Sequence, residues 1–200
     1  CSLRPHETSL CFSAVFTLNE NLDILEEWFG RTVIHSDRRF TYAEAQEIIE
    51  TGRGDYAEEV LTLNRLAQAL RKERFRNGAI SFDREEVKFR LDENGKPLGV
   101  YFKEQKESNQ MIEEFMLMAN EAVATLFTRK KLPTIYRIHD APSLAKQEGL
   151  REFLATLSIP LAKGGNVRAN SFNGILAKAE GTPQQTMVNE MVLRSQSQAI

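Results

Sequence analysis

Two adjacent carboxylates, Glu113 and Glu114, lie in the segment 108–128, whose apolar residues recur at three-to-four spacing. That spacing predicts an α-helix, and its many apolar positions predict the most buried helix of the chain. Neighbouring residues on a helix point about 100° apart, so at most one carboxylate can face fully toward the core. In one interpretation both are solvated; in the other, one points into a cleft and accepts hydrogen bonds from a substrate hydroxyl group. The residues alone leave both open.

Basic residues gather at the ends of two predicted helices. The run Arg71–Arg76 contains four cations and one aromatic ring, and the run Arg129–Lys131 contains three cations. Cations at a helix C-terminus interact favourably with the helix dipole, which is a sufficient explanation for both runs. Contact with nucleic-acid phosphates is the alternative.

Two aromatic residues, Tyr42 and Phe82, each lie at an element boundary beside charged neighbours. A boundary aromatic commonly fills a gap in the core. If it is exposed in a groove instead, it offers a platform for a nucleic-acid base, worth about 1–3 kcal/mol per stacked base.

The sequence predicts no metal site. Three histidines, His6, His35 and His139, lie far apart, and Cys1 and Cys11 have neither metal-ligand spacing nor the number needed for a disulfide framework. The glycine-rich phosphate loop, the dinucleotide-binding glycines and the nucleophile elbow are also missing from the sequence.

The composition is that of a folded domain. The chain has 200 residues, 42% of them hydrophobic and 27% charged, which excludes collagen, low-complexity disorder and a coiled-coil rod. A net charge of −2 argues against a purely electrostatic nucleic-acid binder but leaves room for a local basic groove. Apolar runs stay shorter than the roughly 18 residues of a membrane span, so we expect no membrane partner. The sequence shows no signal peptide, and its two cysteines are typical of reduced thiols, so we expect a cytoplasmic protein.

The pattern of elements predicts an α+β fold with a mixed, mostly antiparallel sheet packed by helices. Thr41 and Glu44 form a capping box before a helix that ends near Gly52, and Asn94-Gly95 indicates a hairpin turn. The predicted strands are 11–18, 22–36, 79–82, 87–91 and 98–102, with 135–139 as a strand or extended loop. The predicted helices are 42–51, 56–76, 108–128, 143–157 and 184–198, with a short helical turn near 171–179.

Six ordered segments resemble the catalytic domain of the ribonuclease R and ribonuclease II family, and ribonuclease R more closely. They are CSLRP at 1–5, RRFTYAEAQEII at 38–49, GAISF at 78–82, IEEFMLMAN at 112–120, IYRIH-AP at 135–142 and LRSQSQA at 193–199. The resemblance covers essentially the whole chain and implies the central portion of an RNB-type catalytic domain over residues 1–200.

The resemblance implies a processive 3′→5′ exoribonuclease that hydrolyses single-stranded RNA to nucleoside 5′-monophosphates with Mg²⁺. Phe82 matches the family's base-stacking phenylalanine, and Tyr42 matches the tyrosine near the terminal nucleotide. Glu113 matches the carboxylate that orients the terminal ribose. A carboxylate can accept a hydrogen bond from a ribose 2′-hydroxyl group, which DNA lacks.

Two family segments are missing from the sequence: the metal-binding D-x-D-D segment upstream of CSLRP and the T-S-P-I-R-R-Y segment downstream of LRSQSQA. We therefore expect that Cys1 marks a cut within a longer enzyme, and that this piece is inactive and binds no metal by itself. We also expect self-association through exposed sheet edges. The alternatives are a non-catalytic RNA-binding or adaptor module on the same scaffold, and a structural protein with chance matches.

Overall fold

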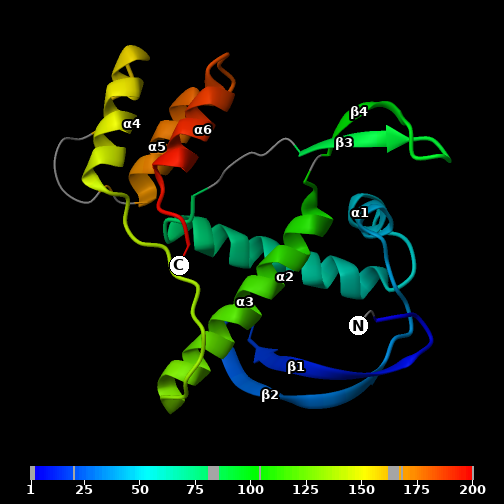
Figure 1. The fold of residues 1–200 in the computed structure, drawn as a ribbon. Coiled ribbons are helices and arrows are strands. Elements are labelled where there is room, and N and C mark those ends of the chain that lie inside the picture. The colour runs from blue at the N-terminus through cyan, green and yellow to red at the C-terminus, as the bar shows by residue number, and fades with distance from the viewer. Residues whose placement is uncertain are drawn as a thin grey trace. The chain divides into compact units, whose positions relative to one another are not determined.

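The computed structural model describes residues 3–19, 21–80, 86–103, 105–161, 167 and 169–199. These residues form six α-helices and two antiparallel two-stranded sheets (Figure 1). The chain divides into two units: unit 1 is Cys1–Lys72 with Gln105–Leu132, and unit 2 is Glu73–Glu104 with Pro133–Ile200. The predicted α+β class with antiparallel strands is confirmed, although the strands form two separate hairpins within the described residues.

Unit 1 begins with a long hairpin of β1 (Thr8–Leu18) and β2 (Ile24–His35), paired from Thr8 opposite His35 to Thr17 opposite Glu26. Its turn is held by the Asn19 side chain, whose Oδ1 accepts the backbone N–H groups of Asn21 and Asp23, both at 2.9 Å. The two predicted strands and the turn between them are confirmed.

Three helices complete unit 1: α1 (Tyr42–Thr51), most of α2 (Ala57–Arg76) and α3 (Glu107–Lys130). The predicted capping box of α1 is present, with Thr41 as the N-cap residue. Gly52 ends α1 in the left-handed conformation, at φ 68°, which glycine adopts without a steric cost. Local sequence signals therefore set both ends of this helix.

Helix α3 is less buried than its apolar pattern predicts. Its buried residues include Met111 and Ala122, but Ile112 and Met116 are exposed. The apolar positions of α3 extend beyond the stripe that is covered in the structure, so the expectation that α3 is the most buried helix is wrong.

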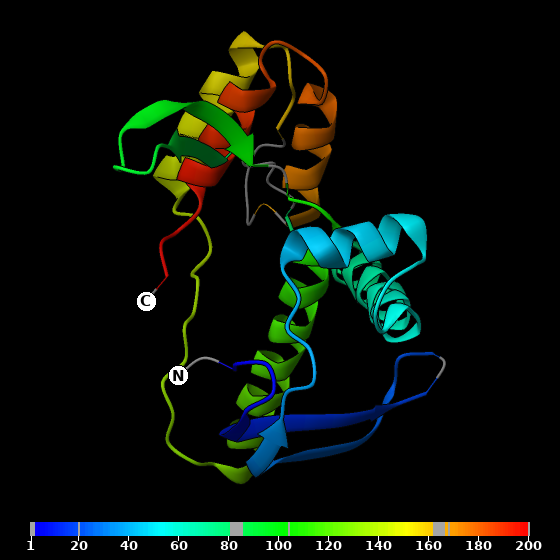
Figure 2. The ribbon, with the colours of Figure 1, turned by 90° about the vertical axis from the view of Figure 1, so that its right-hand side faces the viewer.

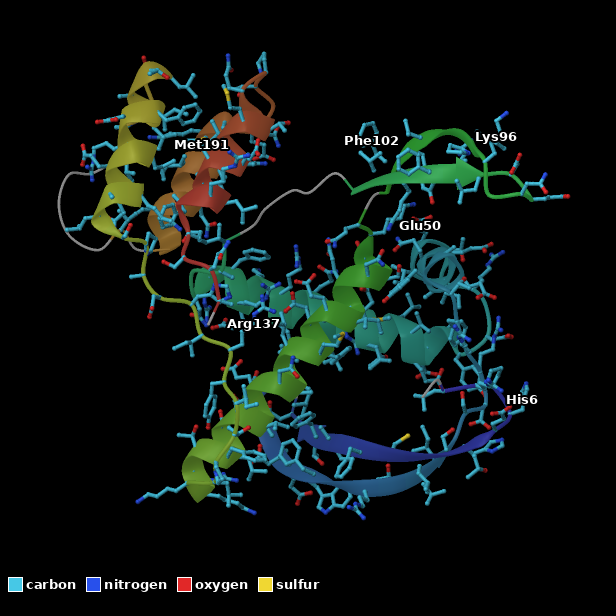
Figure 3. All side chains as sticks on the ribbon, in the orientation of Figure 1. His6, Glu50, Lys96, Phe102, Arg137 and Met191 are labelled. Atoms are coloured by element: carbon cyan, nitrogen blue, oxygen red, sulfur yellow. The ribbon has the colours of Figure 1, made fainter. Side chains whose placement is uncertain are left out.

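Unit 2 contains the larger apolar core, between α4 (Leu144–Thr156), α5 (Ala169–Ala179) and α6 (Gln185–Ser195) (Figure 2). Helix α5 has 11 residues where the sequence predicts only a short helical turn. The buried members of this core are Leu150, Leu154, Leu161, Phe172, Ile175, Leu176, Ala179, Val188 and Val192. Met191 of α6 packs against them (Figure 3).

The second hairpin, β3 (Glu86–Leu91) with β4 (Pro97–Lys103), also belongs to unit 2 and confirms the predicted Asn-Gly turn. Ala79 and Ile80 are not in a strand, and the rest of the strand predicted at 79–82 lies outside the described residues. The segment 135–139 is extended and is held by an isolated bridge between His139 and Ala199.

Among the described residues, every helix is too short or too polar to cross a membrane.

Candidate RNA-contacting site

Tyr42 lies at the edge of an open cavity of about 940 Å³ in unit 1. It is the first residue of α1, and its side chain is 51% exposed. The cavity lies between the segment 36–42 and the helices α1, α2 and α3. Its lining includes Arg38, Phe40, Tyr42, Tyr56, Ser108 and Met111.

Arg38 organises the entrance of this cavity. Its Nη2 donates to Glu44 Oε1 at 2.9 Å, and its Nε lies 3.4 Å from Asp55 Oδ2. Its guanidinium group also lies over the ring of Phe40, 4.9 Å from the centroid, and Phe40 meets Tyr56 edge to face at 6.5 Å. These contacts connect the residues before α1 with those after it and join Arg38, Phe40 and Tyr56 into one cluster.

Glu44 is strongly stabilised as a carboxylate. Its pKa is lowered from 4.5 to about 2, first by the hydrogen bond from the Thr41 backbone N–H, then by the Thr41 hydroxyl group and by Arg38. The cavity lining contains two arginines, Arg38 and Arg39, and two acidic residues, Asp37 and Glu59. Because these charges balance, the cavity suits stacking of a ring better than capture of a phosphate group by charge alone.

The inner wall of the cavity is the start of α3, and α1 holds it in place. Gln46 Oε1 accepts the backbone N–H of Ser108 at 3.0 Å. Gln46 Nε2 donates to Glu50, and Lys106 lies 3.3 Å from the same Glu50 carboxylate, at the end of α1 (Figure 3). Gln46 first, and Lys106 second, lower the pKa of Glu50.

Glu113 and Glu114, the two adjacent glutamates of α3, occupy different environments. Glu114 is 3% exposed, and its Oε1 lies 3.3 Å from Nη1 of Arg71 on α2. Glu113 is half-buried and does not line the Tyr42 cavity. The interpretation in which both carboxylates are solvated is therefore wrong. Glu114 has an ion pair with Arg71, and the ribose contact of Glu113 stays a prediction.

The remaining predicted site residues are distributed differently. Phe82 lies outside the described residues. In the first basic run, Arg71 pairs with Glu114 and Arg74 lies over the Phe75 ring at 5.0 Å. In the second, Arg129 donates to Glu27 of β2 at 2.9 Å, across 102 residues. Protein contacts therefore account for Arg71 and Arg74 in the first run and for Arg129 in the second.

Sequence reasoning missed Tyr56 and Ser108 as parts of the cavity. Tyr56 directly precedes α2 and has a positive φ of 54°, a conformation that no local sequence signal announces. Ser108 is 1% exposed, and its position depends on Gln46, which is 62 residues away. Only the tertiary fold brings these residues to Tyr42.

A Mg²⁺ site would need several carboxylates or other hard oxygen ligands close together. In the described part of the chain, no three His, Cys, Asp or Glu side chains form such a group. The described residues therefore do not fit a magnesium centre.

The fold is similar to that of two solved proteins. RNase R of Mycoplasma genitalium, solved in complex with ribose-methylated single-stranded RNA, superposes with a TM-score of 0.89 at 23% identity, over 100% of this chain and 32% of that one. Yeast Ssd1, described as a pseudonuclease, superposes with a TM-score of 0.68 at 15% identity, over 99% of this chain and 24% of that one.

Sequence comparison then defines the family. Residues 1–200 match the RNB domain model, and the chain belongs to the RNB domain family. Ribonuclease R of Aquifex aeolicus is 31% identical over 205 aligned residues, covering 100% of this chain and 29% of that protein. The DIS3-like exonuclease 2 of Caenorhabditis elegans is 35% identical over 180 residues, covering 80% of this chain and 21% of that protein. The chain thus spans less than a third of these relatives, and the predicted family resemblance is confirmed.

Proposed function

We propose that the complete protein containing this chain is a processive 3′→5′ exoribonuclease that hydrolyses single-stranded RNA to nucleoside 5′-monophosphates with Mg²⁺. The observation that carries the proposal is the RNB match over all 200 residues, supported by ribonuclease R at 31% identity over the whole chain. RNase R of Mycoplasma genitalium has been solved with single-stranded and with double-stranded RNA, which supports RNA as the partner. We also expect a cytoplasmic enzyme, because the chain's two cysteines are typical of reduced thiols.

In this proposal the chain is the central portion of the catalytic domain. It contributes contacts to the 3′-terminal nucleotides, while the metal-binding aspartates and the phosphate-contacting arginine come from the D-x-D-D and T-S-P-I-R-R-Y segments of the complete protein. The 200-residue chain is then inactive by itself.

Each of the three predicted residues has one role. Tyr42 contacts the terminal nucleotide, and its half-exposed ring at the edge of a cavity of about 940 Å³ supports this role. Phe82 stacks on a base, which explains binding that tolerates any sequence because every base has a π-face. Glu113 accepts a hydrogen bond from the terminal 2′-hydroxyl group and so distinguishes ribose from deoxyribose.

The activity is tested with a single-stranded RNA labelled uniformly along its length, Mg²⁺ and either the complete protein or the 200-residue chain. We expect the complete protein to release monophosphates without intermediate-length products, and the isolated chain to release none above background. If the complete protein binds the RNA without shortening it, the exonuclease proposal is wrong.

The residue roles are tested in the complete protein with matched oligonucleotides that end in ribose or in 2′-deoxyribose. We expect Glu113→Ala to reduce the preference for ribose and Tyr42→Ala to weaken binding of both oligonucleotides, with Tyr42→Phe close to the unmodified protein. Unchanged sugar preference in Glu113→Ala would remove Glu113 from the site.

The second candidate function is a non-catalytic RNA-binding or adaptor module. The fold similarity to Ssd1 favours this module, because Ssd1 has the same fold and is a pseudonuclease. The two candidates differ in the sequence that precedes the chain: a D-x-D-D segment there favours the enzyme, and its absence from the complete protein favours the module.

A further inference from the structure

Three side-chain hydrogen bonds join α2 and α3 in a row, which we call the polar seam. They are Asn64 Nδ2 to Glu107 Oε2 at 2.7 Å, Gln68 Nε2 to Gln110 Oε1 at 3.4 Å, and Arg71 Nη1 to Glu114 Oε1 at 3.3 Å. All six residues belong to unit 1.

The spacing of the polar seam follows the helical repeat. Its members on α2 are four and three residues apart, and those on α3 are three and four residues apart, so each set lies on one stripe of its helix. Every donor is on α2 and every acceptor is on α3. Rotating α3 by one residue, about 100°, would separate all three pairs at once. The polar seam therefore fixes the rotation of α3 about its axis, as polar contacts between helices do when they specify register.

Within the polar seam, the ion pair between Arg71 and Glu114 is the contact whose loss costs the most free energy. Glu114 is 3% exposed, and the Arg71 side chain is 22% exposed. Breaking a buried ion pair is costly, so the protein resists any movement that separates Arg71 from Glu114. Asn64 is also buried, and it holds the start of α3 through Glu107.

Glu113 directly precedes Glu114, so its direction is set once Glu114 is fixed. We propose that Arg71 is a positioning residue: through Glu114 it sets the angle at which Glu113 meets the terminal ribose. This inference rests on the proposed exoribonuclease function and on the role of Glu113 in it. Small displacements matter because a shift of about 1 Å at a reacting group costs up to roughly 100-fold in rate.

The test uses the complete protein and measures its rate on oligonucleotides that end in ribose or in 2′-deoxyribose. Arg71→Ala is expected to reduce the ribose-to-deoxyribose rate ratio about tenfold. Arg71→Lys, which keeps the charge but lacks the planar fork, should restore part of the ratio. Arg65→Ala is the matched control, because Arg65 is an exposed arginine on the same helix.

A double-mutant cycle separates this inference from the function on which it rests. If Arg71 acts through Glu113, then Arg71→Ala has no further effect on the rate ratio in a Glu113→Ala background. An unchanged ratio in Glu113→Ala alone overturns the proposed role of Glu113. A changed ratio in Glu113→Ala with an unchanged ratio in Arg71→Ala overturns only the positioning role.

Loss of folding is controlled with Glu114→Gln, which keeps the shape of the side chain and removes its charge. A protein with this substitution that retains its circular dichroism spectrum should show the same loss of sugar preference as Arg71→Ala. A folded Glu114→Gln protein with full sugar preference would contradict the positioning role.

Discussion

At the scale of single residues, Glu44 contributes both to the N-terminal cap of α1 and to the position of Arg38. It completes the capping box of α1 through the Thr41 backbone N–H at 2.7 Å, and it accepts the hydrogen bond of Arg38 at the cavity entrance. The start of α1, where Tyr42 lies, and the position of Arg38 therefore depend on the same carboxylate.

The lowered pKa of Glu44 predicts a pH-dependent stability. Because its pKa falls from 4.5 to about 2 on folding, the stabilisation is fully present above pH 4.5 and is lost as the pH falls toward 2. Glu44→Gln should therefore lower the thermal midpoint at neutral pH, and the difference from the unmodified protein should shrink between pH 4.5 and 2. The measurement is thermal unfolding of the complete protein across this range.

Glu47→Gln is the control for this prediction, since Glu47 is an exposed glutamate on the same helix. A midpoint difference for Glu44→Gln that stays constant from neutral pH down to pH 2 would show that Glu44 titrates normally.

The sequence predicts the residue-scale features whose partners are close along the chain. Thr41 and Glu44 are three residues apart, and their capping box is present as expected. The burial of Glu114 depends on Arg71, 43 residues away, and the pattern of the surrounding helix gives no hint of it. Polar residues at matching helical spacing on both helices are the signal that would have indicated this pairing.

At the scale of elements, the short loop between α1 and α2 carries Tyr56 to the cavity and Asp55 to Arg38. Gly54 in this loop has a φ of 140°, which other residues rarely adopt, and a Cβ atom there would lie 2.7 Å from Ile48 Cγ1. Ile48 is a buried residue of α1, so this contact cannot relax cheaply.

Gly54→Ala should therefore destabilise the protein more than Gly52→Ala. Gly52 also has a positive φ, 68°, but a Cβ atom there meets nothing within 4 Å among the described residues. We expect a cost of about 1 kcal/mol for Gly52→Ala, from backbone strain alone, and about 2 kcal/mol or more for Gly54→Ala. Urea unfolding of the complete protein measures both, and equal costs would contradict the steric argument.

Element boundaries were predictable where local chemistry sets them, as at the Asn94-Gly95 turn and at Gly52. The full length of α5 was not predictable. This helix is stabilised by the core contacts of Phe172 and Ile175 rather than by a local start signal. The exposure of α3 was also missed, since apolar spacing predicts a face but not what covers it.

At the scale of the whole molecule, the β3–β4 hairpin has one strongly apolar face. Its members are Val87, Phe89, Leu91, Leu98, Val100 and Phe102, with exposures from 48% to 70% (Figure 3 labels Phe102). Each sheet has two strands, so within the described residues every strand also has an edge without a hydrogen-bonded neighbour. Both features favour association with other protein surface.

We therefore expect the 200-residue chain to self-associate, with an apparent mass by light scattering that rises with concentration. Phe89→Lys should shift the chain toward the monomer, because it places a charge in the apolar face. Tyr101→Lys, on the opposite face of the same hairpin, should change the mass little. A chain that is monomeric at every concentration would contradict this prediction.

After α6 the chain returns to α4 and to the segment that precedes it. Ala199 bridges to His139, and Lys146 Nζ donates to the backbone oxygen of Gln196 at 2.7 Å, 50 residues along the chain. Bringing the two ends of this long segment together costs conformational entropy. Only the packing of the intervening helices offsets that cost. Amide hydrogen exchange should therefore show α4, α5 and α6 exchanging together as one cooperative unit, rather than helix by helix.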